Sequence, residues 1–337
     1  MGSFPTPVEG LTLLSKQLGR QVLYIKRDDL SGNPYGGNKV RKLEFILADA
    51  VQKGIRKIVT SGAAGSNHAL ATAIYGQKLG LEVELLLFSQ PSTEEVRTNL
   101  LADFHAEAQL HHAASYAEHL RRMEEFLQRA AEGNEDIYVI PPGGSMPLGV
   151  LGYVNAAFEL KMQIEQGELP EPDEIFVAYG TMGTAVGLAL GVSMAGLHSK
   201  IRAVRVVPDI VANEAKLQKL SESTRRLLAA SDSALAALSI EPENMSVEHA
   251  FFGPGYGEGT REASEAIELF DKFQQITLDR TYTAKAAAAF LAAARQNTGD
   301  KNLLFWLTKN SCPLPAEVLC IDFHRLPEAL YSYFEGA

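Results

Sequence analysis

Cysteine is scarce in this chain of 337 residues, which holds only Cys312 and Cys320, both close to its end. The two lack Cys-x-x-Cys spacing and no pair of histidines lies near them, so the sequence offers neither a disulfide framework nor a zinc site. Other histidines also lack ligand spacing to nearby acidic residues, and we expect no bound metal. These are His105, His111, His112, His119, His249 and His324. A reducing, cytoplasmic location suits such a chain best.

Positive charge and long apolar runs are also in short supply. The formal charge is −10 at pH 7 and the isoelectric point is near 5.4, which argues against nucleic acid or an anionic membrane as a partner. The most apolar stretch, residues 178–196, contains five glycines and is typical of a loop followed by a buried helix. We find no signal peptide pattern and expect no membrane partner.

The chain instead alternates short β-rich runs with amphipathic helices. We predict strands at 57–60, 83–88 and 174–179, each followed by a helix. Such alternation is typical of an α/β protein in which helices cover both faces of a parallel sheet. At 337 residues the chain is long enough for two domains, and residues 163–173, rich in Glu and Pro, form its clearest linker. Residues 217–248 have weak patterning, and we expect a mobile helical excursion there.

Lys39 lies in the most informative stretch, residues 36–44 (GGNKVRKLE). Two glycines allow the backbone to approach a bulky ligand, and Asn38 is a suitable cap for a helix beginning at Lys39. The positive end of the helix dipole disfavours a charged amine on the first turn, and only a neutral amine attacks an aldehyde. A solvated basic helix face is the alternative interpretation.

Three glycine-bearing loops each follow a predicted strand, where ligands bind in open parallel sheets. The first is Gly65-Ser66-Asn67-His68. At a helix N-terminus, Ser66 and Asn67 would hold a carboxylate, and the Asn67 amide could donate to a phenolate oxygen. Helix capping alone would also explain both residues.

The second loop is Gly180-Thr181-Met182-Gly183-Thr184, in which backbone N–H groups and two hydroxyls could hold a phosphate. Its glycine spacing is not the G-x-G-x-x-G of dinucleotide-binding folds, and no Gly-Lys-Ser/Thr follows. A nucleotide-binding oxidoreductase is therefore disfavoured, and a single phosphate is the simpler interpretation. A tight turn without a ligand is the alternative.

The third loop, residues 253–260 (GPGYGEGT), exposes the ring of Tyr256 between glycines, although a surface turn would have the same composition. A lysine, a phosphate loop, an amide donor and an aromatic ring together match the groups that bind pyridoxal 5′-phosphate.

These motifs occur in the order and spacing of a known family. From about Pro5 to Thr308 the chain resembles the 1-aminocyclopropane-1-carboxylate deaminase/D-cysteine desulfhydrase family. The resemblance is carried by residues 36–44, by Ser66-Asn67-His68, by Gly183-Thr184 and by Gly255-Tyr256-Gly257. It implies fold type II of the pyridoxal-phosphate enzymes, the tryptophan-synthase-β-like fold, with two doubly wound open parallel-sheet domains. We expect residues 1–48 and 164–337 to form a large cofactor-binding domain and residues 49–163 a small one, in a homodimer.

The resemblance also implies roles for individual residues. Lys39 would be the Schiff-base lysine and an acid or base at the substrate Cα, with Ser66 and Tyr256 as the other catalytic residues. The cofactor would be bound by Lys39, Lys42, Asn67, Gly180, Thr181, Met182, Gly183, Thr184 and Thr308. The substrate would contact Ser66, Asn67, His68, Tyr256 and Thr260.

The sequence departs from the family pattern around the substrate. Ala64-Gly65 replaces a usual Ile-Gln, Leu70 replaces a frequent arginine, and residues 307–310 (LTKN) replace His-Thr-Gly-Gly. These changes affect the prediction of the substrate more than that of the cofactor.

The partner of the pyridine nitrogen helps to set the reaction. A carboxylate would keep the nitrogen protonated, as the opening of a cyclopropane ring needs, whereas a hydroxyl suffices for expelling thiolate. The resemblance points to Thr308, with Thr260 and Glu258 as alternatives, and His68 and Thr260 fit the desulfhydrase pattern better. We therefore expect a lyase that converts D-cysteine to pyruvate, sulfide and ammonia. The alternatives are a deaminase that forms 2-oxobutanoate and a homologue that binds the cofactor without turnover.

Overall fold

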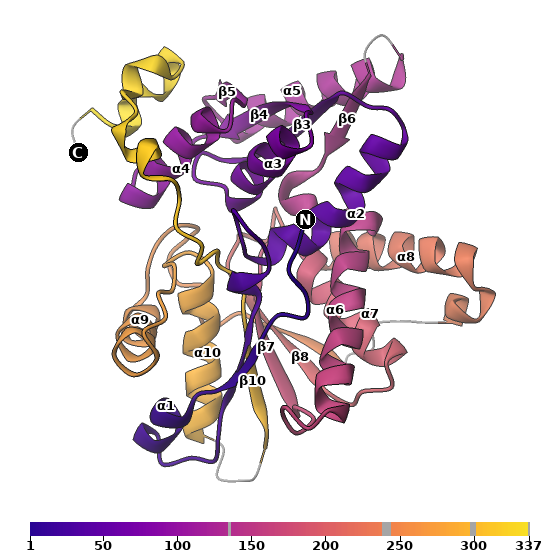
Figure 1. Cartoon of the computed structure of the whole chain (residues 1–337), viewed down its shortest axis with the longest axis vertical. Helices are drawn as coiled ribbons and strands as arrows, with labels where there is room; N and C mark the ends of the chain where they lie inside the picture. Colours follow the sequence, from indigo (N-terminus) through magenta and orange to yellow (C-terminus); the bar gives the residue numbers. More distant parts are fainter. Residues whose placement is uncertain (134–135, 238–243, 297–300, 336–337) are drawn as a thin grey trace. The chain divides into compact units, whose positions relative to one another are not determined.

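The computed structural model describes residues 1–133, 136–237, 244–296 and 301–335 (Figure 1). The chain divides into two compact α/β units. The large unit comprises residues 2–42 and 145–311, and the small unit comprises residues 43–144 and 312–337 together with Met1. These boundaries differ from the domain division expected from the sequence, most of all because residues 312–337 belong to the small unit. The division into residues 1–48 with 164–337 and residues 49–163 remains a prediction of the domain boundaries.

The large unit contains a six-stranded sheet in the order β1-β2-β10-β7-β8-β9. All neighbouring strands run parallel except β1, which pairs antiparallel with β2. The strands are β1 (Val8–Gly10), β2 (Tyr24–Arg27), β7 (Glu174–Tyr179), β8 (Lys200–Arg205), β9 (Met245–Glu248) and β10 (Leu303–Leu307). All five residues of β10 are buried, as expected for a central strand covered on both faces.

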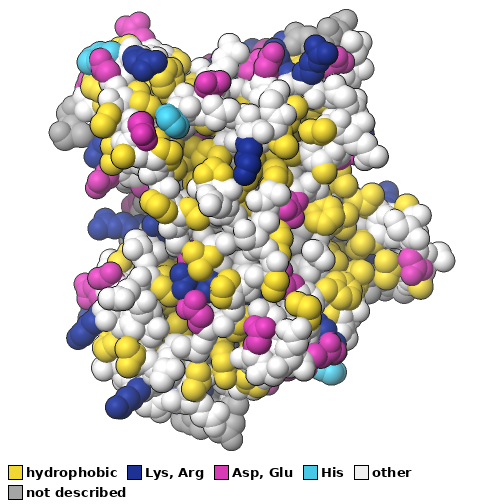
Figure 2. All heavy atoms as spheres, in the orientation of Figure 1, with side chains coloured by type: hydrophobic (Ala, Val, Ile, Leu, Met, Phe, Trp, Pro, Cys, Tyr) yellow, Lys and Arg dark blue, Asp and Glu magenta, His cyan; other side chains and the backbone are white. Residues whose placement is uncertain are grey.

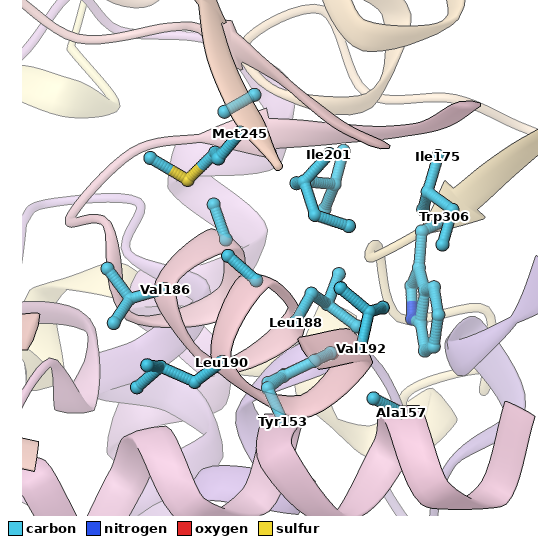
Figure 3. Close-up of a cluster of buried hydrophobic side chains, with 14 of the residues drawn as sticks. Tyr153, Ala157, Ile175, Val186, Leu188, Leu190, Val192, Ile201, Met245 and Trp306 are labelled. Carbon is cyan, nitrogen blue, oxygen red and sulfur yellow. The ribbon is translucent and has the colours of Figure 1, made fainter. Parts of the chain in front are cut away.

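Helices cover both faces of this sheet. On one face, α6 (Pro147–Glu165) and α7 (Gly183–Met194) form a core with β7, β8 and Trp306 (Figure 3). On the other, α1 (Thr12–Gln17), α9 (Arg261–Gln274) and α10 (Thr283–Gln296) enclose an apolar cluster around Phe290 and Phe305. The predicted α/β class with doubly wound parallel sheets is confirmed.

Two glycines allow α6 and α7 to pack at short range. A β-carbon on Gly187 would lie 2.4 Å from Cβ of Tyr153, and one on Gly191 would lie 2.6 Å from Cβ of Ala157. The apolar, glycine-rich stretch at 178–196 is therefore a strand end, a loop and a buried helix, as predicted. Among the described residues, no helix is long and apolar enough to cross a membrane.

In the poorly patterned region, α8 (Glu214–Ser231) is a regular helix, and β9 closes the edge of the sheet. The sequence prediction of a helical excursion therefore missed β9. Residues 238–243 of that region lie outside the described residues.

The small unit has a fully parallel four-stranded sheet in the order β5-β4-β3-β6. Its strands are β3 (Lys57–Ala63), β4 (Glu82–Phe88), β5 (Gln109–Ala113) and β6 (Ile137–Ile140), and its helices include α3 (Asn67–Lys78), α4 (Glu94–His105) and α5 (Tyr116–Ala131). Met123 and Phe126 of α5 pack on Val59 and Leu86 of the sheet. The C-terminal 3-10 turns join this unit, where Ser92 donates to the carbonyl of Tyr333. On the face shown in Figure 2, basic side chains lie scattered among acidic and apolar ones.

Candidate functional site

Lys39 is the second residue of α2 (Asn38–Gln52), and the glycines before it pack against the protein itself. A β-carbon on Gly36 would lie 2.1 Å from the carbonyl oxygen of Asp29. Gly37 has φ of +86°, and its β-carbon would lie 2.9 Å from the carbonyl oxygen of Thr308. The two glycines are therefore needed so that the start of α2 can lie directly on neighbouring backbone. This differs from their predicted role in admitting a ligand.

Asn38 also has a different role from the predicted helix cap. The helix begins at Asn38 itself, and its side-chain amide donates to Oγ1 of Thr184 at 3.0 Å. Its backbone N–H donates to the carbonyl of Thr308 at 3.1 Å. Asn38 thus connects the start of α2 to the start of α7, on which the predicted phosphate loop ends.

The amine of Lys39 is chemically poised to act as a nucleophile. Burial lowers its pKa to about 8, and the negative charge of Asp279 opposes this shift. The direction of the shift is the one predicted from the sequence, and desolvation by burial is its largest cause. At pH 7 about one-tenth of such amines are neutral, against about 0.03% for an ordinary lysine.

Lys42 and Ser145 converge on the predicted phosphate loop. A β-carbon on Gly183 would lie 2.9 Å from Nζ of Lys42 and 2.9 Å from Oγ of Ser145. The Ser145 hydroxyl donates to Oγ1 of Thr181 at 2.8 Å and accepts from the N–H of Gly183 at 3.3 Å. Ser145, which directly follows Gly143 and Gly144, was not predicted from the sequence as part of this site.

The same loop is shaped for an anion. Met182 has φ of +71°, which turns the backbone so that α7 begins at Gly183 with its N–H groups at the loop. Burial, together with the charge of Lys39, lowers the pKa of Lys42 well below its usual value. A phosphate here would restore the charged form of Lys42. The amine, the hydroxyls and the helix N-terminus fit the phosphate of pyridoxal 5′-phosphate.

Beneath this region lies a buried ionic network. Asp28 accepts from Nη2 and Nε of Arg41 at 2.8 and 2.9 Å, from Nε1 of Trp306 at 2.7 Å and from the hydroxyl of Tyr153 at 2.6 Å. Burial alone would raise the pKa of Asp28, but the Arg41 guanidinium holds it below its usual value. Arg41 lies between Lys39 and Lys42 in the sequence, so the network fixes the turn of α2 that carries both amines.

Tyr256 shares a hydrogen bond with Tyr282, hydroxyl to hydroxyl, and the ring centroids are 6.0 Å apart. Tyr282 was missed from the sequence. Its N–H donates to Oδ1 of Asp279 at 2.6 Å, so that Asp279 caps the start of α10. The feature of the sequence that could have indicated Tyr282 is Asp279, an acidic residue shortly before the alanine-rich helix α10. Lys285 of α10 holds the Tyr256 loop by donating to the carbonyl of Gly255 at 3.0 Å.

The three candidate partners of the pyridine nitrogen have local functions of their own. Oγ1 of Thr260 caps α9 by accepting from the N–H of Ala263 at 3.1 Å. Glu258 lies beside Gly255, where a β-carbon would be 2.9 Å from Oε1. Thr308 is buried and accepts from Asn38 through its carbonyl. Their roles toward the cofactor stay predictions.

In the small unit, Ser66, Asn67 and His68 form the junction between β3 and α3. Oγ of Ser66 caps α3 by accepting from the N–H of Ala69 at 3.3 Å. Asn99 of α4 donates to Oδ1 of Asn67 at 3.2 Å. Their roles as catalytic, cofactor and substrate residues stay predictions.

His68 is buried, and its Nε2 lies 3.0 Å from Oγ1 of Thr60. The Thr60 hydroxyl donates to the carbonyl of Ile140 at 2.9 Å, so Nε2 of His68 carries the proton that Thr60 accepts. A contact of His68 with substrate stays a prediction.

Gly65, where the family pattern has glutamine, is required by a close approach of α4. A β-carbon on Gly65 would lie 2.8 Å from Cγ2 and 3.2 Å from Cα of Val96. The departure from the family pattern thus coincides with the position of α4. Within the described part of the chain, no group of three His, Cys, Asp or Glu side chains could hold a metal ion.

The chain resembles known proteins over most of its length. The sequence profile of the family described as "Pyridoxal-phosphate dependent enzyme" matches residues 1–309. A protein from Pyrococcus horikoshii, provisionally named 1-aminocyclopropane-1-carboxylate deaminase, is 36% identical over 304 residues, 89% of this chain and 87% of its own. A protein from Pyrococcus furiosus with the same provisional name is 35% identical over 308 residues, 89% of this chain and 88% of its own.

Solved structures also resemble this chain in fold. The crystal structure of a protein described as an ACC deaminase homologue has a TM-score of 0.76 and 32% identity, and covers 91% of this chain and 90% of its own. The processed form of threonine deaminase isoform 2 from Solanum lycopersicum has a TM-score of 0.61 and 16% identity, and covers 94% of this chain and 81% of its own. The second likeness concerns the fold alone.

Proposed function

Since the chain belongs to the family of pyridoxal-phosphate-dependent enzymes and is of the 1-aminocyclopropane-1-carboxylate deaminase-like type, we propose that it eliminates the β-substituent of a small amino acid. The substrate we propose is D-cysteine, with pyruvate, sulfide and ammonia as products. The observation that carries the proposal is the pairing of the Lys39 amine, of lowered pKa, with the anion-binding arrangement of Lys42, Ser145 and Gly183.

The residues divide into two tasks. Gly180, Thr181, Met182, Gly183 and Thr184, with Lys42 and Ser145, would hold the phosphate. When bound, the cofactor supplies an aldehyde for amines and an electron sink for the charge that develops at the substrate Cα.

Lys39 would hold the proton that leaves and returns at Cα, for which a pKa near 8 is well matched to neutral pH. Ser66 would bind the substrate carboxylate or move a proton. Tyr256, its hydroxyl aligned by Tyr282, would lie beside the reacting atoms. Asn67 would donate to the phenolate oxygen of the cofactor, and His68 and Thr260 would border the substrate.

Thiolate is a good leaving group, so elimination from D-cysteine does not need a protonated pyridine nitrogen. This suits a hydroxyl partner, and we propose Thr308, with Thr260 as the alternative. The second candidate function is 1-aminocyclopropane-1-carboxylate deamination, which the provisional names of the Pyrococcus relatives favour. It would call for a carboxylate at the nitrogen, and Glu258 is the nearest in sequence to Tyr256.

One assay separates these functions. Purified protein would be supplied with cofactor and offered D-cysteine, L-cysteine, cysteate, D-serine and 1-aminocyclopropane-1-carboxylate, with release of pyruvate and 2-oxobutanoate measured. Pyruvate from D-cysteine alone supports the proposal, and 2-oxobutanoate at a comparable rate supports the deaminase. A visible cofactor band without any product would identify a catalytically silent homologue.

We also propose that the enzyme works in the cytoplasm as a homodimer. The sequence has only two cysteines and no Cys-x-x-Cys spacing, which suits a reducing compartment. Light scattering of the purified protein measures the oligomeric state directly.

A further inference from the structure

Asn99 lies on α4 with 5% of its surface exposed, and it makes two hydrogen bonds from one nitrogen. Its Nδ2 donates to the carbonyl oxygen of Gly65 at 3.0 Å and to Oδ1 of Asn67 at 3.2 Å. Asn99 is therefore attached to the turn that carries Asn67 at two points, one on the backbone and one on the side chain.

The identity of these groups follows from hydrogen-bond chemistry. A backbone carbonyl can only accept, so the end of the Asn99 amide that faces Gly65 must be its NH2 group. That group has two hydrogens, and the second points to the Asn67 side chain. The atom of Asn67 that receives it must be an acceptor, which is Oδ1. The Asn67 amide is thereby oriented with its NH2 group turned away from Asn99.

The turn that holds Asn67 cannot easily shift to change this orientation. The N–H of Gly65 donates to Oε1 of Gln90 at 3.0 Å, and the N–H of Ser66 donates to the carbonyl of Ala63 at 2.9 Å. Val96, three residues before Asn99 on α4, lies so close to Gly65 that no side chain fits between them.

We propose that Asn99 is a positioning residue, which orients the Asn67 amide so that Asn67 offers a donor, and not an acceptor, to the cofactor. The inference rests on the proposed function, in which Asn67 faces the phenolate oxygen of pyridoxal 5′-phosphate. A donor at that oxygen favours its ionised form, and an acceptor disfavours it. Asn99 therefore acts on the cofactor through Asn67, without touching it.

Asn99→Asp is the decisive variant, because a carboxylate cannot donate to Asn67 or Gly65 and would instead attract the Asn67 NH2 group. We expect a cofactor dissociation constant raised about tenfold or more and a shift of about one unit in the pH midpoint of the cofactor's visible absorbance. Asn99→Ser, which is too short to reach both acceptors, should shift both quantities in the same direction by less. It replaces Asn99→Asp if that variant does not fold.

Two controls separate positioning from general damage to α4. Leu100→Ala removes a fully buried neighbour on the same helix, and should lower the melting temperature while leaving the absorbance midpoint unchanged. In an Asn67→Ala background, Asn99→Asp should have no further effect on that midpoint.

The outcomes are distinct. If Asn67→Ala alone leaves the dissociation constant and the midpoint unaltered, the proposed role of Asn67 is wrong and the inference about Asn99 falls with it. If Asn67→Ala shifts them but Asn99→Asp does not, Asn67 keeps its role and only the inference about Asn99 is overturned. An Asn99→Asp shift that persists without Asn67, or that Leu100→Ala reproduces, also overturns it.

Discussion

Arg41 and Asp28 form a buried ion pair with two parallel hydrogen bonds of 2.8 and 2.9 Å, under the turn of α2 that carries Lys39 and Lys42. Both side chains are almost completely inaccessible to solvent. Water cannot replace either partner at such a site, so removal of one partner would leave the other as a poorly compensated buried charge.

Loss of Asp28 should be costly. Asp28→Ala leaves the buried Arg41 with Glu159 as its remaining acidic partner, and we expect the free energy of unfolding to fall by about 3–5 kcal/mol. Urea denaturation measures this directly. The matched control is Glu125→Ala, which breaks an exposed helix pair with Arg121 and should cost about 0.5 kcal/mol. If both variants lost the same free energy of unfolding, the buried pair would be no more stabilising than an exposed one.

The same pair predicts a pH dependence. The pKa of Asp28 is lowered on folding, so its contribution is fully present above the unfolded pKa of about 3.9 and is lost as pH falls through the folded value. The stability difference between wild type and Asp28→Ala should therefore be constant at neutral pH and shrink below about pH 4. A difference that stays unchanged into strong acid would argue against this assignment.

Lys39 should capture the cofactor in a pH-dependent manner. Because the neutral amine is the nucleophile, the rate of covalent attachment to cofactor-free protein should rise with pH, with a midpoint near 8. Lys39→Ala should abolish attachment and retain the fold, whereas the exposed Lys53→Ala should change nothing. Stopped-flow absorbance follows the reaction, and a midpoint near 10.5 would mean that the amine is not desolvated.

Asp279 should tune that midpoint. Its charge raises the pKa of Lys39 against the larger effect of burial, so Asp279→Asn should move the midpoint of attachment to lower pH. Asparagine still caps a helix, so α10 should remain intact by circular dichroism. A midpoint that moves upward or not at all would exclude an electrostatic effect of Asp279 on Lys39.

Gly183 should be the most sensitive position of the phosphate loop. Gly183→Ala would place a methyl group 2.9 Å from both Lys42 Nζ and Ser145 Oγ, and we expect the dissociation constant of the cofactor to rise at least tenfold. Gly180→Ala is the comparison within the same loop: its β-carbon would have no neighbour nearer than 3.8 Å, so we expect a smaller rise. Thr184→Val, which removes a hydroxyl, should cost about 1–3 kcal/mol of cofactor binding. Unchanged binding in both Gly183→Ala and Thr184→Val would place the phosphate elsewhere.

The α/β class could be predicted from the sequence because strand and helix periodicities alternate along most of the chain. The edge strand β5 (QLHHA) has two histidines in place of an apolar pattern, and gives no comparable signal. Lys39 was proposed as the reactive amine of the site from its neighbours in the sequence, residues 36–44. The place of Ser145 beside the phosphate loop could not be predicted in this way, because its partners Thr181 and Gly183 lie 36 and 38 residues further along the chain.

The glycines show a second limit. A sequence reveals that a position has no side chain, but not whether a ligand or another part of the chain occupies the space. For Gly36 and Gly37 the neighbour is the protein's own backbone, and for Gly183 it is an amine and a hydroxyl suited to an anion. Only the folded structure shows whether the space beside a glycine is filled by the chain itself or is available to a ligand.

Trp306 is the only tryptophan of the chain, is fully buried on β10 and donates to Asp28. Its fluorescence therefore reports on the large unit alone, and unfolding confined to the small unit should leave the emission unchanged. Far-ultraviolet circular dichroism detects helices of both units. Denaturation curves recorded with the two signals would coincide for a single cooperative transition and separate if the small unit unfolds first, so the wild-type protein carries its own optical label for one of its halves.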